Sequence, residues 1–370
     1  MMKSKKWGTM LLAGVLAVTG VFGLMGDQKA EAAASITTAV RKVSVSGRTY
    51  SVQTVTIPKG TKAALGLAQG QVGQTQSFAS IIKNSNATAA INGAFFNSYG
   101  GPADPYGTLI SKGQIVHTGY YGTSIGFKKD GTALMDSLRA NIRGTVSSKP
   151  DKAGKSKTLG WYATFVNRTP EARQNVVLMY NTARGSNVGF SGGIAVTVRK
   201  GKVVKKGANT NTAIPSDGYV LVYHGSEKDN AGRFEVGSTV DMEITYTDAA
   251  GKTIAWEDVV TAVGAGPRLV KDSKVSLDAK GEGFNDPKIL TASGARSGIA
   301  IMPDGSVMLA TVSGATMGQW AQVMQKLGAK QAMNLDGGAS SALYANGRTL
   351  TGAGRQLSNT LVFGQWVAMQ

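Results

Sequence analysis

The sequence predicts an α+β fold in which a mixed β-sheet core with few helices carries an inserted β-rich subdomain. Most apolar stretches are short and are bounded by Gly, Pro, Asn or Asp, as strands are. The clearest helix is at 317–327, where apolar residues recur at i, i+3, i+4 and i+7. Within 160–255, β-like runs follow one another with turn residues between them, which predicts a subdomain built from strands.

Residues 1–34 have the pattern of a secretory signal peptide. A Lys-rich start is followed by an apolar run at 10–24 and by Ala-rich cleavage sites that end at Ala34. An uncleaved membrane anchor is the alternative, but the apolar run is shorter than the roughly 20 residues that span a bilayer. We therefore expect cleavage near Ala34 and a secreted, extracellular or cell-wall-associated protein with no stable membrane insertion.

The composition restricts the chemistry that this chain can perform. It has 40 Lys and Arg, 22 Asp and Glu, two His and no Cys, with a formal net charge of +18. The absence of Cys excludes disulfides and thiolate sites, and two distant His residues do not have the spacing of a zinc site. The positive charge favours an anionic partner. Because the basic residues are spread out without interleaved aromatic residues, we expect a phosphate-containing glycan and no nucleic acid.

After an N-terminal β-strand region at 35–88, the main domain is predicted to span 89–366. Its first strand ends at Asn92, and the following Gly-Ala-Phe-Phe allows either a hairpin with a core Phe pair or part of a ligand site. The next loop, which is rich in Gly and Pro, contains Asp104. The basic, polar segment 137–157 is expected to be a loop or an exposed ribbon that precedes the β-rich insertion.

Three arginines stand near the ends of predicted strands. The strand at 259–264 leads through Gly and Pro to Arg268, Arg296 precedes another strand, and Arg355 lies in a Gly-rich loop before the last strand. A guanidinium can bind two phosphate oxygens at once, although a surface Arg at a turn fits the spacing of Arg268 equally well. The Gly-x-Gly before Arg268 lacks the rest of a nucleotide-binding motif, so nucleotide binding is not expected.

The densest group of polar residues follows the apolar strand predicted to begin at Gln331. It consists of Asn334, Asp336, Gly337, Gly338, Ser340 and Ser341. Period-two alternation puts the Asn and the Asp on the same side of an extended chain, and the two glycines let a ligand approach the backbone closely. Asp-Gly is also a strong hairpin signal. On spacing alone, a ligand site and a β-hairpin both remain open here.

Five motifs in chain order resemble the phosphodiester glycosidase family. They are Ile91-Asn-Gly-Ala-Phe-Phe96, Gly264-Ala-Gly-Pro-Arg-Leu-Val270, Ala295-Arg-Ser-Gly-Ile-Ala300, Asn334-Leu-Asp-Gly-Gly-Ala-Ser-Ser341 and Arg355-Gln-Leu-Ser-Asn359. The departures are small-for-small: Ala94 and Ala339 stand where the family usually has Gly, and Ser297-Gly298 where it often has Thr-Ala. The resemblance implies an α-N-acetylglucosaminidase-like hydrolase that cleaves the C1–O bond of a sugar-1-phosphodiester, with the substrate's identity left open.

This chemistry suggests a role for each candidate residue. A phosphate monoester leaves easily as an anion, so the site needs little general-acid help. It needs a carboxylate to activate water or attack C1, and cations or N–H groups to hold the departing phosphate. The catalytic candidates are Asp336, Asn334 and, as a second carboxylate, Asp104. The substrate-binding candidates are Asn92, Arg268, Arg296, Gly337, Gly338, Ser340, Ser341, Arg355 and Asn359. We assign no metal ligands and no cofactor, and a Ca²⁺ requirement stays open.

Two other classes of function compete with a glycosidase. The first is a non-catalytic envelope polysaccharide-binding protein on the same fold. The second is a phosphodiesterase that cleaves the P–O bond, although such enzymes usually need a metal cluster of His and Asp, which this sequence does not provide. Activity on a sugar-1-phosphodiester separates the enzyme from the binding protein, and the identity of the bond that is cleaved separates the two enzymes.

Overall fold

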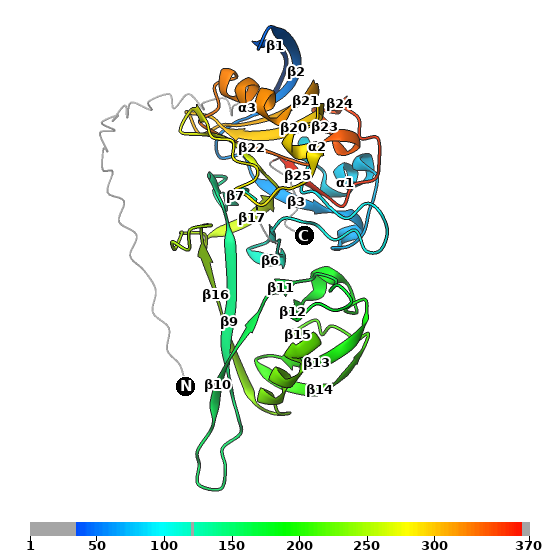
Figure 1. Ribbon diagram of the computed structural model, residues 1–370, viewed down its shortest axis with the longest axis vertical. Helices are drawn as coiled ribbons and strands as arrows, with labels where there is room; N and C mark the ends of the chain where they lie inside the picture. Colours follow the sequence, from blue (N-terminus) through cyan, green and yellow to red (C-terminus); the bar gives the residue numbers. More distant parts are fainter. Residues whose placement is uncertain (1–34, 120–121, 365–370) are drawn as a thin grey trace, which may run out of the picture. The chain divides into compact units, whose positions relative to one another are not determined.

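The computed structural model describes residues 35–119 and 122–364 (Figure 1). Residues 1–34, on which the predicted signal peptide falls, lie outside the described residues. The described residues form one compact unit. In the part of the chain that the structure describes, no helix combines the length and the hydropathy needed to cross a bilayer.

The largest sheet of the main domain has seven strands in the order β1-β2-β21-β20-β22-β18-β19. All of its pairings are antiparallel. Its strands are β1 (Thr37–Val45), β2 (Arg48–Ile57), β18 (Arg268–Lys271), β19 (Lys274–Val275), β20 (Gly294–Ile301), β21 (Val307–Ala315) and β22 (Gln331–Asn334). Strands β1 and β2 form a hairpin, in which the chain turns at Ser46 and Gly47, both with positive φ.

Two five-stranded sheets complete the main domain, and their pairings are also antiparallel. The first has the order β24-β23-β4-β25-β3 and consists of β3 (Ala63–Leu67), β4 (Ala89–Asn92), β23 (Leu343–Ala345), β24 (Arg348–Thr351) and β25 (Asn359–Phe363). The second has the order β6-β5-β17-β7-β8 and consists of β5 (Leu109–Ser111), β6 (Gln114–His117), β7 (Ser124–Lys128), β8 (Ala133–Asp136) and β17 (Val259–Gly264).

An eight-stranded sheet accounts for the β-rich middle of the chain. Its order is β10-β9-β16-β14-β13-β15-β12-β11, with one parallel pair, β11–β12, among the described pairings. The strands are β9 (Arg139–Ser147), β10 (Thr158–Ala163), β11 (Phe165–Val166), β12 (Val176–Tyr180), β13 (Ser191–Arg199), β14 (Lys202–Thr210), β15 (Gly218–His224) and β16 (Thr239–Thr247). The sheet thus begins within the basic segment 137–157 and extends through most of 160–255.

The helices are short. They are α1 (Phe78–Ser85), α2 (Pro287–Leu290) and α3 (Met317–Lys326), with 3₁₀ turns η1 (Ala68–Gly70), η2 (Thr182–Arg184), η3 (Gly225–Arg233) and η4 (Gly338–Ser340). The predicted helix α3 is confirmed, and it begins with a capping box between Thr316 and Gln319. The predicted α+β class with many strands and few helices is likewise confirmed.

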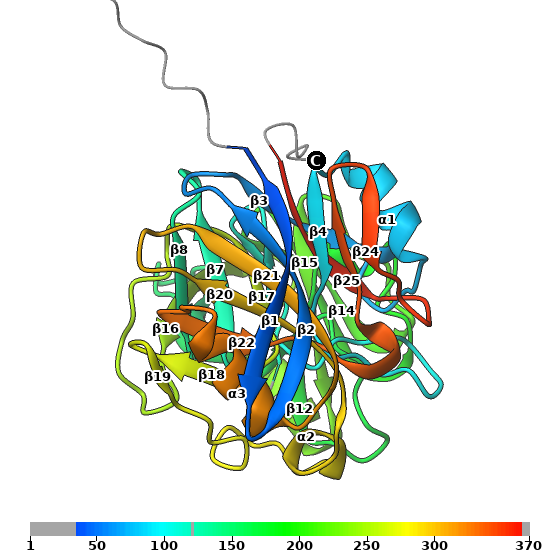
Figure 2. The same cartoon turned by 90° about the horizontal axis from the view of Figure 1, so that it is seen from above.

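One apolar core joins the three sheets of the main domain. It contains Ile91 of β4, Phe127 of β7 and Met333 of β22, all fully buried. Trp320 of α3 packs against the other face of the seven-stranded sheet, and Ile81 of α1 packs against the sheet that contains β25. Figure 2 shows α3 beside the first of these sheets and α1 beside the second. Because apolar residues cover both faces of the seven-stranded sheet, polar side chains at its strand ends must find partners in the loops. The candidate site lies among these loops.

Candidate active site

Asp336 is positioned by the ends of two strands from different sheets. Strand β22 ends at Asn334 and β4 ends at Asn92. The Asp336 N–H donates to the Gly93 carbonyl at 3.0 Å, and Asn92 Nδ2 donates to the Asp336 carbonyl at 2.6 Å. The Ala342 N–H donates to Asn92 Oδ1 at 3.0 Å. The buried Asn92 amide therefore fastens both ends of the loop that carries Asp336, which is a structural role and not the predicted contact with a sugar hydroxyl.

The hairpin alternative is excluded by the strand pairing. Strand β22 pairs with β18 and β20, whereas β23 pairs with β4 and β24. The Asp336-Gly337 step therefore begins a crossover between two sheets. A Cβ at Gly337 would lie 2.8 Å from the Ala295 carbonyl oxygen, and Gly338 has a φ of +60°. Both glycines are thus required by the backbone path of this crossover.

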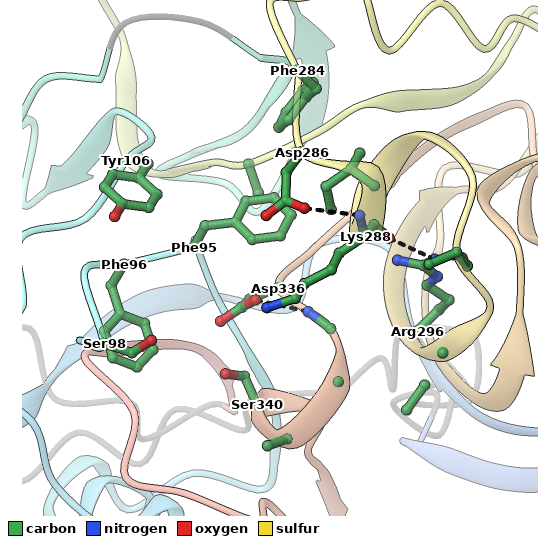
Figure 3. Close-up of a pocket in the computed structure, with 18 of the residues that line it drawn as sticks. Phe95, Phe96, Ser98, Tyr106, Phe284, Asp286, Lys288, Arg296, Asp336 and Ser340 are labelled. Carbon is green, nitrogen blue, oxygen red and sulfur yellow. Dashed lines mark hydrogen bonds between the residues drawn. The ribbon is translucent and has the colours of Figure 1, made fainter.

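The Asp336 carboxyl lies in a cavity of about 470 Å³ (Figure 3). The walls come from three segments, at 95–107, 284–296 and 336–340, together with Ala265 and Arg355. Five aromatic side chains line the cavity: Phe95, Phe96, Tyr99, Tyr106 and Phe284. A cavity of this size with aromatic walls and a few charged groups is typical of a small-molecule site, and aromatic faces suit the apolar faces of a sugar ring.

The environment of Asp336 makes its carboxyl a proton acceptor near neutral pH. Burial raises the pKa of Asp336 to about 6, while hydrogen bonds from the Ser340 hydroxyl and the Gly337 N–H, and the charge of Arg355, act in the opposite direction. The Gly337 N–H donates to Asp336 Oδ1 at 2.8 Å. A carboxyl with a shifted pKa in a cavity is the usual signature of a catalytic acid or base. Ser340, a predicted substrate-binding residue, lines the cavity, and its hydroxyl forms a hydrogen bond with Asp336.

Two basic side chains reach the same cavity from separate loops. Arg355 was expected from the sequence, whereas Lys288 of α2 was not, and both are exposed. Lys288 Nζ lies 3.4 Å from Tyr99 Oη and 5.7 Å from the centre of its ring. Hydrogen bonds and charge from Lys288 and then Arg355 lower the pKa of Tyr99. Lys288 and Arg355 therefore provide two exposed cations that could pair with an anionic ligand in the cavity.

A sequence signal for α2 was available and was missed. Asp286 caps the helix by accepting the Lys288 N–H at 2.8 Å, and Pro287 occupies the first turn. Asp followed by Pro is a common start signal for a helix. The signal locates a helix but says nothing of a ligand. Asp286 also lines the cavity with Asp336, so among the described residues these two carboxylates share it.

The structure does not support phosphate binding by Arg296 or Arg268. The Arg296 guanidinium is buried and donates to the carbonyls of Ala315 at 3.0 Å, Lys288 at 3.0 Å and Ala292 at 2.6 Å. Although Arg296 adjoins the cavity, it fixes the segment after α2 (Figure 3). Arg268 donates to Gln331 Oε1 at 2.8 Å and to the Met135 carbonyl at 2.7 Å, away from the cavity.

Asp104 is not a second catalytic carboxylate. Its Oδ1 forms a buried ion pair with Arg184 Nη1 at 2.6 Å, and its Oδ2 accepts the Thr169 N–H at 2.7 Å. Arg184 and Thr169 both belong to the β-rich middle of the chain. Asp104 therefore links that region to the main domain and does not line the cavity.

The remaining predicted residues hold the loops around the site. Asn334 is fully buried and donates to the carbonyls of Gly266 at 3.2 Å and Leu335 at 2.6 Å. Asn359 Oδ1 accepts the Ala94 N–H at 2.8 Å. Ser341 is also buried and does not line the cavity. Within 35–119 and 122–364, no three His, Asp or Glu side chains are grouped so as to hold a metal ion.

Three solved structures resemble the chain. A hypothetical protein from Synechocystis is 26% identical with a TM-score of 0.75, and the match covers 89% of this chain but 62% of that one, less than two thirds of its length. A protein from Burkholderia pseudomallei K96243 is 21% identical with a TM-score of 0.66, covering 85% and 74% of the two chains. The catalytic domain of zebrafish N-acetylglucosamine-1-phosphodiester alpha-N-acetylglucosaminidase, auto-inhibited by its pro-peptide, is 12% identical with a TM-score of 0.47, covering 90% and 83%.

The sequence comparison identifies one family. No curated protein is significantly similar to the chain. Residues 192–364 match the model of the phosphodiester glycosidases, and this range contains Lys288, Asp336 and Arg355. The resemblance inferred from the five motifs is confirmed by this match. Over residues 192–364, the chain is therefore similar to the phosphodiester glycosidase family.

Proposed function

We propose that this protein hydrolyses the C1–O bond of a sugar-1-phosphodiester in a phosphate-linked glycan. The observation that carries the proposal is the Asp336 carboxyl, whose pKa is raised to about 6, in one cavity with Arg355 and Lys288. The aromatic walls accept a sugar ring, the carboxylate faces the reacting carbon, and the two cations receive the phosphate. The similarity of residues 192–364 to the phosphodiester glycosidase family supports the same class of reaction.

In this mechanism Asp336 works in its ionised form. Above a pH of about 6 the carboxylate either removes a proton from the attacking water or attacks C1 itself. Ser340 and the Gly337 N–H hold its orientation. The sequence suggested that the Gly337 N–H binds the phosphate. Because this N–H already donates to Asp336 Oδ1, we assign it the role of positioning the carboxylate.

The leaving phosphate is bound by Arg355 and Lys288. Charge moves onto the phosphate as the C1–O bond breaks, so cations at this position stabilise the transition state more than the ground state. Because the phosphate leaves as an anion, no acid is required to protonate it. The exposed positions of Arg355 and Lys288 leave both side chains able to close on the ligand.

The proposal is tested with a panel of sugar-1-phosphate methyl diesters in water enriched in oxygen-18. We expect the label in the C1 hydroxyl of the released sugar, and we expect Asp336→Asn to remove most turnover while the protein stays folded. Label in the phosphate would establish cleavage of the P–O bond instead. Binding without turnover of any diester by the wild-type protein would favour the non-catalytic polysaccharide-binding alternative.

We further propose that the protein acts outside the cytoplasm on an anionic glycan, secreted or associated with the cell wall. The Lys-rich start, the apolar run at 10–24 and the Ala-rich segment before Ser35 support export, and the net charge of +18 favours a polyanionic partner. Mass spectrometry of culture supernatant should find a mature N-terminus between Ala33 and Ser35. Intact protein retained in the membrane fraction would argue for the anchor alternative.

A further inference from the structure

A separate cavity of about 840 Å³ lies in the β-rich middle of the chain. Its walls are the paired strands β9 and β10, the residue that follows β10, and Arg233 of η3. It shares no lining residue with the cavity of Asp336. The proposed reaction makes no use of this cavity, so its lining calls for a function of its own.

Tyr162 gives this cavity an exposed aromatic wall. Its side chain is 42% exposed because β10 is the edge strand of the sheet and Gly160, two residues before it on the same face, has no side chain to cover the ring. Trp161 points to the other face, where it is buried and its Nε1 donates to the Asp241 carbonyl at 3.1 Å. The Tyr162 ring is thus left available to the apolar face of a sugar ring.

Two arginines place positive charge in the same cavity. Arg143 of β9 is the register partner of Tyr162 and is exposed. Its partner on the other side is Glu243 of β16, but no ion pair joins the two among the described residues. Arg233 Nη1 donates to the Gly160 carbonyl at 2.7 Å, which holds this guanidinium against β10. A guanidinium has five N–H donors, so both arginines retain donors for phosphate oxygens.

The positive charge continues along the hairpin that joins β9 to β10. This segment, 148–157, has four exposed lysines: Lys149, Lys152, Lys155 and Lys157. Its one acid, Asp151, uses its carboxylate within the turn, where Oδ1 accepts the N–H groups of Ala153 at 2.8 Å and Lys155 at 2.9 Å. At about 3.3 Å per residue, Arg143 and Lys149 are about 20 Å apart along the chain. A polymer with repeated anionic groups can contact the cavity and the lysines together, whereas one sugar phosphate cannot.

From this arrangement we propose that the β9–β10 cavity and its hairpin form a non-catalytic binding site for an anionic, phosphate-linked glycan chain. Tyr162 binds a sugar ring, Arg143 and Arg233 bind the phosphate next to it, and the hairpin lysines bind phosphates further along. The choice of phosphate as the anion rests on the proposed function. Binding at this site requires no cleavage, and it keeps the protein on a polymer that the cavity of Asp336 can then attack.

The experiment measures, by calorimetry at an ionic strength of about 0.15 M, the binding of three polymers of matched length: phosphorylated dextran, unmodified dextran and inorganic polyphosphate. We expect phosphorylated dextran to bind at least ~10-fold more tightly than either of the others, because it alone offers sugar rings and phosphates. Polyphosphate that binds equally well would reduce the surface to non-specific charge and overturn the proposal. Dextran that binds equally well would overturn the role of the cations.

Substitutions at the cavity locate the effect. Tyr162→Ala and Arg143→Gln should each weaken the binding of phosphorylated dextran by at least ~10-fold, whereas Tyr162→Phe, which keeps the ring, should bind within about twofold of wild type. Arg41→Gln on β1 is the matched control for the lost charge, because Arg41 is exposed and lines neither cavity, and it should also bind within about twofold. Wild-type affinity in Tyr162→Ala and Arg143→Gln, with unchanged circular dichroism, would overturn the proposal.

The binding measurement separates this inference from the catalytic proposal. Cleavage of sugar-1-phosphate diesters by a protein whose polymer binding is unaffected by Tyr162→Ala and Arg143→Gln overturns the inference alone. Polymer binding that is lost in these two variants, in a protein that cleaves no diester, supports the inference and overturns the proposed function.

Discussion

The raised pKa of Asp336 predicts that the candidate catalytic group reduces the stability of the folded protein at neutral pH. Its pKa increases from 3.8 to about 6 on folding, which corresponds to about 3 kcal/mol at 1.36 kcal/mol per pKa unit. The folded state binds the proton more tightly than the unfolded state. The destabilisation is therefore absent below pH 3.8, grows as the pH rises, and is complete above a pH of about 6.

Asp336→Asn removes this titration while keeping an oxygen to accept the Gly337 N–H. We expect the variant to unfold at higher urea concentrations than the wild type, with a difference in free energy of unfolding of about 1 kcal/mol at pH 4.5 and about 3 kcal/mol at pH 8. Asp304→Asn is the control with the opposite sign, because hydrogen bonds from Ser306 lower the pKa of Asp304. That variant should lose stability relative to wild type as the pH rises.

The same titration should appear in the kinetics. If Asp336 must be ionised, kcat/KM should rise about tenfold per pH unit below a pH of about 6 and level off above it.

The stability measurement would refute the reasoning if the gain in free energy of unfolding in Asp336→Asn stays constant, or becomes smaller, between pH 4.5 and 8. It would mean that Asp336 is an ion-paired carboxylate with an ordinary or lowered pKa, held mainly by Arg355.

Three further predictions concern the residues around the site. Arg355→Lys should lower kcat/KM at least ~10-fold at unchanged stability. Arg268→Lys should leave kcat/KM within about twofold but lower the free energy of unfolding by about 1–3 kcal/mol, because its buried hydrogen bonds are lost. Steady-state kinetics and urea titration of both variants check these expectations. Lys288→Ala should raise the pKa of Tyr99 toward its ordinary value, as followed by ultraviolet titration of the phenol, and an unchanged titration would contradict the contact. Asn92→Ala should lower the free energy of unfolding by about 2–3 kcal/mol, because the Asp336 carbonyl and the Ala342 N–H lose their partner; a loss below about 0.5 kcal/mol would contradict its role.

The structure places the candidate residue Asp336 in a cavity, but it places most of the other candidates in the loops around that cavity. Asp336 stood out because an apolar strand ends beside it and two glycines follow. Asn92, Asn334 and Arg296 stood out for the same reason, yet each is buried and bonded to backbone groups of a loop. A buried polar residue at a strand end has the same sequence pattern whether it supports a loop or faces a ligand, because both roles need a polar group next to a core.

The missing groups came from segments that look like ordinary loops. Lys288 lies on a helix of four residues that Asp286 caps, and Tyr99 lies in a Gly-rich turn. None of them has a periodic apolar neighbourhood that marks its position. They reach the cavity only through the pairing of β20 with β22 and the crossover at Asp336. Such long-range pairings could not be deduced from local patterns, although the strands, α3 and the α+β class could.

The ion pair between Asp104 and Arg184 bears on the modularity of the protein. A Cβ at Gly73 would lie 3.0 Å from Arg184 Nη1 and 3.2 Å from Asp104 Oδ1. The β-rich middle thus supplies the counter-ion for the buried Asp104 carboxylate of the main domain. Deleting this region would leave the Asp104 carboxylate buried without its partner and would lower the free energy of unfolding by about 3–5 kcal/mol. A shortened relative without this region would therefore need a different residue at position 104, so the two segments are expected to change together in evolution.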